Sequence, residues 1–142
     1  MSLAELLQRS DVTSEKLPIE GSVRVGGPVS PEQVWLVYKA EDRFEGLEGQ
    51  FEVGEGIIAS ASRKVLESIV ETGSARSVIG LVGYAGWAPS QLEDEIRVGA
   101  WLPTDVAVSL VFEVPCEETW QRAYEFVGTS PIAFTGRTIG SA

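Results

Sequence analysis

Alternating apolar and polar residues predict strands in the first half of the chain. Residues 22–25 alternate, and residues 34–38 are rich in residue types that favour strands. A Gly-Gly-Pro turn at 26–28 separates the two segments, so we expect them to pair as a hairpin. A nearly continuous apolar run at 77–82, followed by Gly83, is typical of a strand covered on both faces. We interpret it as a central strand.

Helical periodicity predicts two longer helices. Ser60 or Ser62 can cap a helix that runs to about Thr72, and Gly73 can end it. A second helix near the C-terminus has apolar residues at i, i+3, i+4 and i+7 and is closed by Gly128. The predicted buried stripes are Val65, Leu66, Ile69 and Val70 in the first helix, and Trp120, Ala123, Tyr124 and Val127 in the second.

Two further elements are expected between these helices. Pro89 suits the first position of a helix whose inward face contains Leu92 and Ile96. The apolar run at 106–113 predicts another buried strand, and the Ser-, Thr- and Gly-containing tail at 129–142 should be weakly ordered.

The elements alternate in type, which predicts a mixed α/β fold. The chain has 142 residues, of which 44% are hydrophobic, and a short apolar helical patch at residues 3–7 precedes the strands. Such a length corresponds to one domain with an adequate core, here residues 1–142.

Charge excludes some classes of partner. Eleven basic residues stand against 21 acidic ones, a net charge of −10, so nonspecific binding to nucleic acid and to anionic membranes is disfavoured. The pair Arg63-Lys64 is better read as part of a solvated helix face, and the six acidic residues at 41–55 as a solvated loop that lacks calcium-loop spacing.

The chain contains one cysteine, Cys116, and no histidine. An intramolecular disulfide, a histidine-bearing metal site, a Ser-His-Asp triad and a Cys-His pair are therefore excluded by composition. Two carboxylates follow Cys116 and oppose thiolate formation, whereas a helix N-terminus would favour it. We expect no cofactor and no metal. Without a signal peptide or an apolar run of about 20 residues, we expect a cytoplasmic protein with no membrane role.

The segment at 83–96 is the most informative, because a strand end, a glycine loop and a helix start follow one another directly. A glycine loop that enters a helix can bind an anion, but this one lacks a phosphate-loop lysine, and three carboxylates follow it. In the alternative, Tyr84, Trp87 and Trp101 wedge the loop and helix against the sheet, while Gln91 and Glu95 bond to loop backbone.

Several of these motifs together resemble the AlgH/YqgE family of bacterial proteins. The resemblance covers roughly residues 23–128 and is carried by Gly26-Gly27-Pro28-Val29, Gly83-Tyr84-Ala85-Gly86-Trp87, Gln91-Leu92-Glu93, Glu95-Ile96, Trp101, Val111-Phe112 and Trp120. It implies a bent sheet with a small barrel-like core, flanked by about three helices, and a cytoplasmic location. It implies little about activity. Its members carry the label of transcriptional regulator, but no DNA-binding surface is evident in this sequence.

The chain departs from the family pattern in two ways. Members usually carry a further strand-rich N-terminal stretch, which is missing here, so an exposed apolar edge could favour a homodimer. Members also often have an arginine near Gln33 and a histidine near Tyr38, and no role of those residues transfers to this chain.

Two functional hypotheses follow. The first is a noncatalytic binding or regulatory module for a protein or small molecule, in which the two glycine loops meet at one end of the sheet. Its candidate residues are Gly26, Gly27, Pro28, Gly83, Tyr84, Gly86, Trp87, Gln91, Glu95 and Trp101. The second is an enzyme that uses Glu93 or Glu95 with Asp94 as acid and base, of which Glu95 is the best placed.

Overall fold

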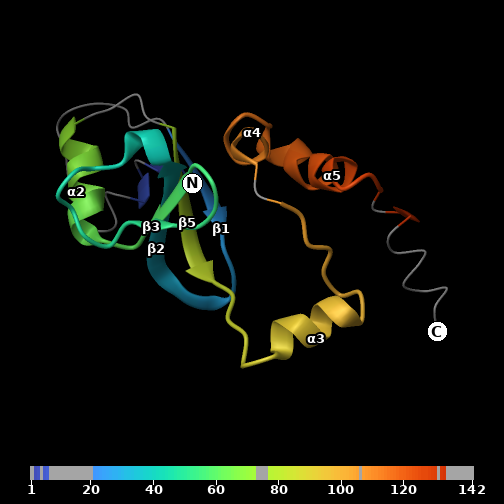
Figure 1. The fold of residues 1–142 in the computed structure, drawn as a ribbon. Helices are drawn as coiled ribbons and strands as arrows, with labels where there is room; N and C mark the ends of the chain where they lie inside the picture. The colour runs from blue at the N-terminus through green and yellow to red at the C-terminus, as the bar shows by residue number, and fades with distance from the viewer. Residues whose placement is uncertain are drawn as a thin grey trace. The chain divides into compact units, whose positions relative to one another are not determined.

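The chain divides into two units, residues 1–86 and residues 87–142. The first holds a β-sheet, and the described part of the second is helical (Figure 1). The computed structural model describes residues 2, 3, 5, 6, 21–72, 77–105, 107–130, 132 and 133.

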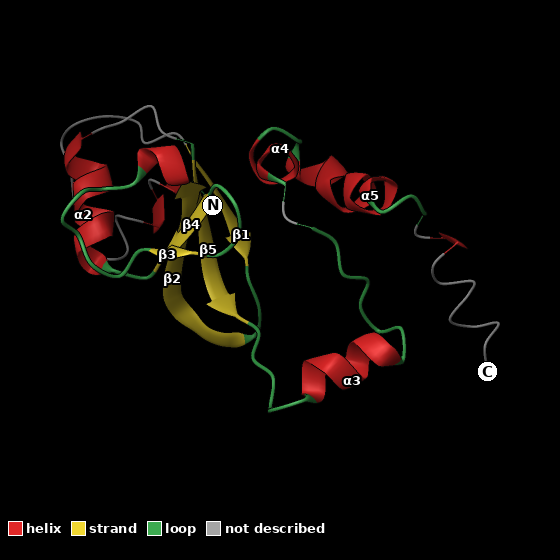
Figure 2. Ribbon diagram, viewed as in Figure 1, coloured by secondary structure: helices red, strands yellow, loops and turns green. Residues whose placement is uncertain are grey.

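A five-stranded mixed sheet organises the first unit (Figure 2). Its strand order is β1-β5-β2-β4-β3, with β1 and β5 parallel and all other neighbours antiparallel. The elements are β1 (Gly21–Val25), β2 (Val29–Lys39), the 3-10 helix η1 (Ala40–Asp42), β3 (Phe51–Glu52), β4 (Ile57–Ser60), α2 (Arg63–Thr72) and β5 (Val78–Tyr84).

Strand β5 lies between β1 and β2, which confirms the apolar run at 77–82 as an internal strand. The hairpin expectation is wrong for the same reason. β1 and β2 both pair with β5 and not with each other, in the registers Arg24↔Leu81 and Trp35↔Leu81. Because β5 is apolar along most of its length, a paired strand on each edge stabilises it. It therefore lies between β1 and β2, although these two strands are close in sequence.

The sheet is bent but remains open. The register of β2 against β5 shifts between Val29 and Val34, where β2 curves in Figure 1. Ser30 has a positive φ of 45° in this stretch, and Pro31 offers no backbone donor there. Strands β1 and β3 are the two edges, so the sheet does not close into the barrel-like core that the family resemblance implied. The mixed α/β class is confirmed.

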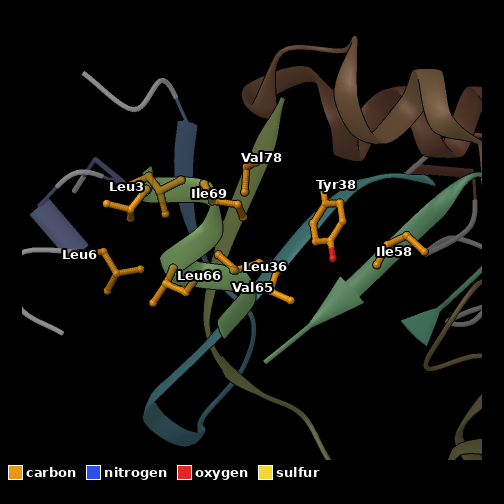
Figure 3. Close-up of a cluster of buried hydrophobic side chains, with 10 residues drawn as sticks. Leu3, Leu6, Leu36, Tyr38, Ile58, Val65, Leu66, Ile69 and Val78 are labelled. Carbon is orange, nitrogen blue, oxygen red and sulfur yellow. The ribbon is translucent and has the colours of Figure 1, made fainter. Parts of the chain in front are cut away.

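Helix α2 covers one face of this sheet, as Figure 3 shows. Its predicted stripe is confirmed: Val65, Leu66, Ile69 and Val70 are all buried. They pack with side chains of β2, β4 and β5 and with two residues of the predicted N-terminal patch: Leu36, Tyr38, Ile58, Val78, Leu3 and Leu6. The proposed terminator of the helix, Gly73, lies outside the described residues.

A buried glutamine organises the loop between η1 and β3. The Gln50 amide Nε2 donates to the carbonyl oxygens of Phe44 and Leu47, both at 2.8 Å. Its Oε1 accepts from the Phe44 backbone N–H at 3.0 Å and from the Tyr38 hydroxyl at 2.8 Å. One side chain thereby fixes the acidic loop to the core residue Tyr38.

Three helices are described in the second unit: α3 (Gln91–Arg97), α4 (Val108–Phe112) and α5 (Cys116–Phe126). The strand predicted at 106–113 is wrong, because residues 108–112 are helical. Backbone N–H groups of Val111 and Glu113 donate to carbonyls four residues earlier. Periodicity cannot distinguish a short buried strand from a short helix, and β-branched residues favoured the wrong alternative.

Helix α5 confirms the last predicted helix, and Gly128 closes it with a φ of +82° and a bond from its N–H to the Glu125 carbonyl at 2.9 Å. The assignment of its aromatic stripe to a core is wrong for Trp120, whose surface is 65% exposed. None of the residues described in α3, α4 or α5 is buried. Most of the tail at 129–142 lies outside the described residues.

Candidate functional site

Glu95 on α3 accepts hydrogen bonds from three side chains. The indole Nε1–H of Trp101 donates to Oε2 at 2.6 Å, and that of Trp87 donates to the same oxygen at 3.3 Å. Gln91 Nε2 donates to Oε1 at 2.9 Å. We call these four residues the indole clamp.

The clamp connects the loops on both sides of α3. Gln91 and Glu95 are four residues apart and therefore share a helix face. The second amide atom of Gln91, Oε1, accepts from the Ala88 backbone N–H at 3.0 Å, which ties down the entry loop. The rings of Trp87 and Trp101 meet edge to face, with centroids 5.9 Å apart. The clamp thus fixes segments before and after the helix.

The hydrogen bonds also determine the charge of Glu95. Donation from Trp101, then from Gln91 and Trp87, lowers the pKa of Glu95 below its ordinary value of 4.5, against a small opposing effect of burial. Each donor stabilises the ionised carboxylate. Glu95 therefore stays charged at neutral pH, and its oxygens are already occupied by the clamp.

The clamp is expected to respond to acid. Because the folded pKa lies below the unfolded value, its stabilising contribution is present above pH 4.5 and is lost as pH falls through the folded pKa. The indole Nε1–H resonances of Trp87 and Trp101 should therefore shift together below pH 4.5. A pH titration by ¹⁵N–¹H NMR measures this.

Two variants control that titration. Glu95→Gln should abolish the acid-dependent shift, whereas Glu93→Gln, an exposed carboxylate on the same helix, should leave it unchanged. Indole resonances that titrate above pH 4.5, or that still titrate in Glu95→Gln, would contradict this account of the clamp.

In the first unit the two predicted glycine loops meet, backbone against backbone. The Gly26 N–H donates to the Val82 carbonyl at 2.9 Å, where the link from β1 to β2 passes the end of β5. A Cβ on Gly26 would overlap the Gly83 carbonyl, and one on Gly27 would lie 2.6 Å from the backbone nitrogen of Ala85. We call this contact of Gly26 and Gly27 with residues 83–85 the glycine crossing.

A hollow of about 300 Å³ lies between the loop after α3 and helix α5. A second hollow, of about 260 Å³, shares Thr104 and Val127 with it, so the two form one groove. The rings of Trp120 and Tyr124 stand edge to face, 5.2 Å apart, on one side. We call this the aromatic groove; its lining residues are Ala100, Trp101, Leu102, Pro103, Thr104, Asp105, Trp120, Ala123, Tyr124, Phe126 and Val127.

Comparison with known proteins places the chain in a family. The family model described as AlgH-like matches residues 1–132. The chain belongs to the AlgH-like family. The AlgH/YqgE resemblance carried by the GYAGW segment and its companions is thereby confirmed.

Relatives of this AlgH-like chain are bacterial. A UPF0301 protein of Anaeromyxobacter sp. strain Fw109-5 is 41% identical over 113 residues, which cover 79% of this chain and 57% of the relative. A UPF0301 protein of Ralstonia pickettii is 33% identical over 137 residues, covering 96% and 70%. The chain thus spans little more than half of the Anaeromyxobacter relative, and the expected loss of N-terminal strands stays a prediction.

The solved structures include a similar fold. The solution structure of the AlgH protein from Pseudomonas aeruginosa superposes with a TM-score of 0.67 at 27% sequence identity. The match covers 95% of this chain and 70% of that one. The likeness therefore extends over nearly all of the AlgH-like chain.

The ten predicted site residues of this AlgH-like chain fall into separate groups. One group forms or adjoins the glycine crossing: Gly26, Gly27, Gly83 and Tyr84. Another forms the indole clamp: Trp87, Gln91, Glu95 and Trp101. Pro28 and Gly86 are exposed. The sequence predicted that Gln91 and Glu95 hydrogen-bond to backbone groups of the loop. Gln91 does so, because it accepts from the Ala88 N–H, but the side chain of Glu95 accepts from side-chain donors instead.

Trp120 and Tyr124 line the groove, but the sequence did not indicate them as site residues. Their helical spacing was the available signal, but the same spacing predicts a core face. What distinguishes the two is exposure, which depends on tertiary packing. Trp101 was selected for its motif, and it belongs to both the indole clamp and the aromatic groove.

The structure also places the predicted basic pair on α2 and the single cysteine. Arg63 pairs with Glu67 at 2.9 Å on an exposed face of α2, as predicted for a solvated helix. Cys116 is exposed at the first residue of α5. Within the described ranges, no three His, Cys, Asp or Glu side chains gather as metal ligands would, and no helix has the length and apolarity to cross a bilayer.

Proposed function

We propose that this AlgH-like domain is a noncatalytic binding module and that its ligand occupies the aromatic groove. The observation that carries the proposal is an open hollow of about 300 Å³ walled by Trp101, Trp120 and Tyr124. Ligand sites are typically concave, mostly apolar and supplied with few polar groups. Large aromatic side chains left exposed in such a hollow gain free energy when a ligand covers them.

The carboxylates of α3 support binding over catalysis. Glu95, the best-placed acid–base candidate, is held ionised by the indole clamp. Asp94 pairs with Arg97, and both Glu93 and Asp94 are exposed. A general acid at neutral pH needs a raised pKa, and the pKa of Glu95 is lowered. The net charge of −10 likewise argues against direct nucleic-acid binding as the basis of any regulatory role.

Native mass spectrometry on gently purified protein tests the proposal, because it assumes no particular ligand. We expect a reproducible additional small mass on the wild-type chain. Trp120→Ala should lose that mass, because Trp120 lines the groove. Phe51→Ala is the control, since Phe51 is also an exposed aromatic residue, at 59% against 65% for Trp120, but lies on β3 in the other unit. An additional mass that survives Trp120→Ala, or a wild-type chain that carries none, would count against the groove as a binding site.

A further inference from the structure

Building on the proposed binding function, we infer that the aromatic groove selects a small organic cation: an alkylammonium head on a short apolar body. Three independent features of the groove carry this inference: its walls, its charge and its size.

Three aromatic side chains line the hollow, two from α5 and one from the loop after α3. Trp120 and Tyr124 make a corner, with their ring planes at 75° to each other, and Trp101 comes from the opposite loop. Ring faces carry negative electrostatic potential and attract ammonium groups, tryptophan most strongly. Several ring faces around one hollow are the arrangement that recognises alkylated ammonium groups.

The indole clamp strengthens one of these walls. The Nε1–H of Trp101 donates to the ionised carboxylate of Glu95 at 2.6 Å, which fixes the orientation of the ring. Donation to an anion also shifts electron density toward the indole ring, so its face attracts a cation more strongly. Glu95 thereby acts on the groove as a positioning residue, through Trp101.

The charge of the groove fits a cation. Asp105 supplies a carboxylate in the hollow that adjoins the aromatic corner, and none of the lining residues is basic. Glu117 precedes Trp120 by one helical turn on α5, at the N-terminal end of the aromatic stripe. Arg122 of the same helix contacts Glu118 at 3.5 Å and Glu125 at 3.2 Å, so its charge is offset. Residues 87–142 contain 8 acidic and 3 basic residues, a net charge of −5.

The size of the groove indicates a small molecule. The hollow at the aromatic corner measures about 300 Å³, at the lower end of the volumes that hold small ligands. The adjoining hollow of about 260 Å³, with Asp105 and Phe126, can take a short apolar or hydroxylated extension. A stable interface with a folded partner takes roughly 20 to 30 residues a side, whereas 11 residues line the two hollows.

Choline and its uncharged isostere 3,3-dimethylbutan-1-ol form the test pair. In ¹⁵N–¹H NMR titrations of the full chain, choline should shift the indole resonances of Trp101 and Trp120 and bind on the order of tenfold more tightly than the isostere. Trp120→Leu should weaken choline binding by roughly tenfold. Asp105→Asn should weaken it about threefold without affecting the isostere. Phe51→Ala, outside the groove, should change neither.

The alternative outcomes are distinguishable. Equal binding of choline and the isostere at the groove would overturn the cation preference and leave the binding module standing. Indole shifts that depend on protein concentration and not on choline would assign the groove to a second copy of the chain and overturn the inference. No binding of either probe would also overturn it, while native mass spectrometry decides separately whether the groove holds another ligand. Glu95→Gln removes the charge but keeps an acceptor for Trp101, so it should weaken choline binding and leave binding of the isostere unchanged. Equal weakening of both probes would show a purely structural role and contradict the role given to Glu95.

Discussion

Replacing Gly83 by alanine is expected to lower the free energy of unfolding of the first unit by about 3 to 5 kcal/mol. Gly83 has a φ of +72°, and its added Cβ would overlap the Gly27 carbonyl oxygen and lie 3.1 Å from that of Val29. Both obstacles are backbone atoms at the start of β2 or in the short link before it, and that link is anchored by strands paired with β5 on both sides, so neither atom can move aside cheaply. Urea unfolding followed by far-UV circular dichroism measures the loss.

Gly46→Ala is a matched control for that substitution. Gly46 has nearly the same φ, +74°, but a Cβ there would meet no atom within 4 Å. Its cost should be the conformational strain alone, about 1 kcal/mol. The difference between the two variants isolates the glycine crossing. If Gly83→Ala costs no more than Gly46→Ala, the crossing is not the close contact described above.

Replacing Gln50 by alanine is expected to cost about 2 to 4 kcal/mol of unfolding free energy. The substitution removes four hydrogen bonds and leaves the Tyr38 hydroxyl and the Phe44 backbone groups without this partner in a buried region. Buried polar groups that lose their partners retain the cost of desolvation. The same urea experiment applies, and hydrogen exchange at the Phe44 amide should accelerate.

Tyr38→Phe serves as the control for Gln50. It removes one of the four bonds and keeps the ring in the core, so the expected loss is about 1 kcal/mol. If Gln50→Ala proves no more harmful than Tyr38→Phe, then the loop is held by something other than the glutamine amide.

Local sequence patterns predicted the elements that form in the same way whichever neighbour they pack against. The stripe of α2 follows from spacing alone, because any sheet face would bury it. The hairpin expectation failed because alternation at 22–25 says that a strand exists but not which strand pairs with it. The strand prediction at 106–113 failed because a short, mostly apolar segment fits either a strand or a short helix.

The sequence indicated those candidate-site residues that lie in recognisable motifs. Gln91 and Glu95 were chosen as part of the helix start that follows the glycine loop, and the two tryptophans for their place in the motifs. The indole partners of Glu95 come from loops on either side of α3, and loop geometry has no periodicity to reveal it. Trp120 was assigned to a core because nothing in a sequence separates an aromatic stripe that packs from one that lines a groove.

The parallel pairing of β1 with β5 has a consequence for how the chain acquires its structure. Gly21 pairs with Val78, so 56 residues must be synthesised between the first partner and the second. Closing so long a loop costs chain entropy before any contact between the two strands compensates it. On the ribosome, β1 therefore stays unpaired with β5 until β5 has emerged, and the antiparallel pair formed by β2 and β4 is available to fold first.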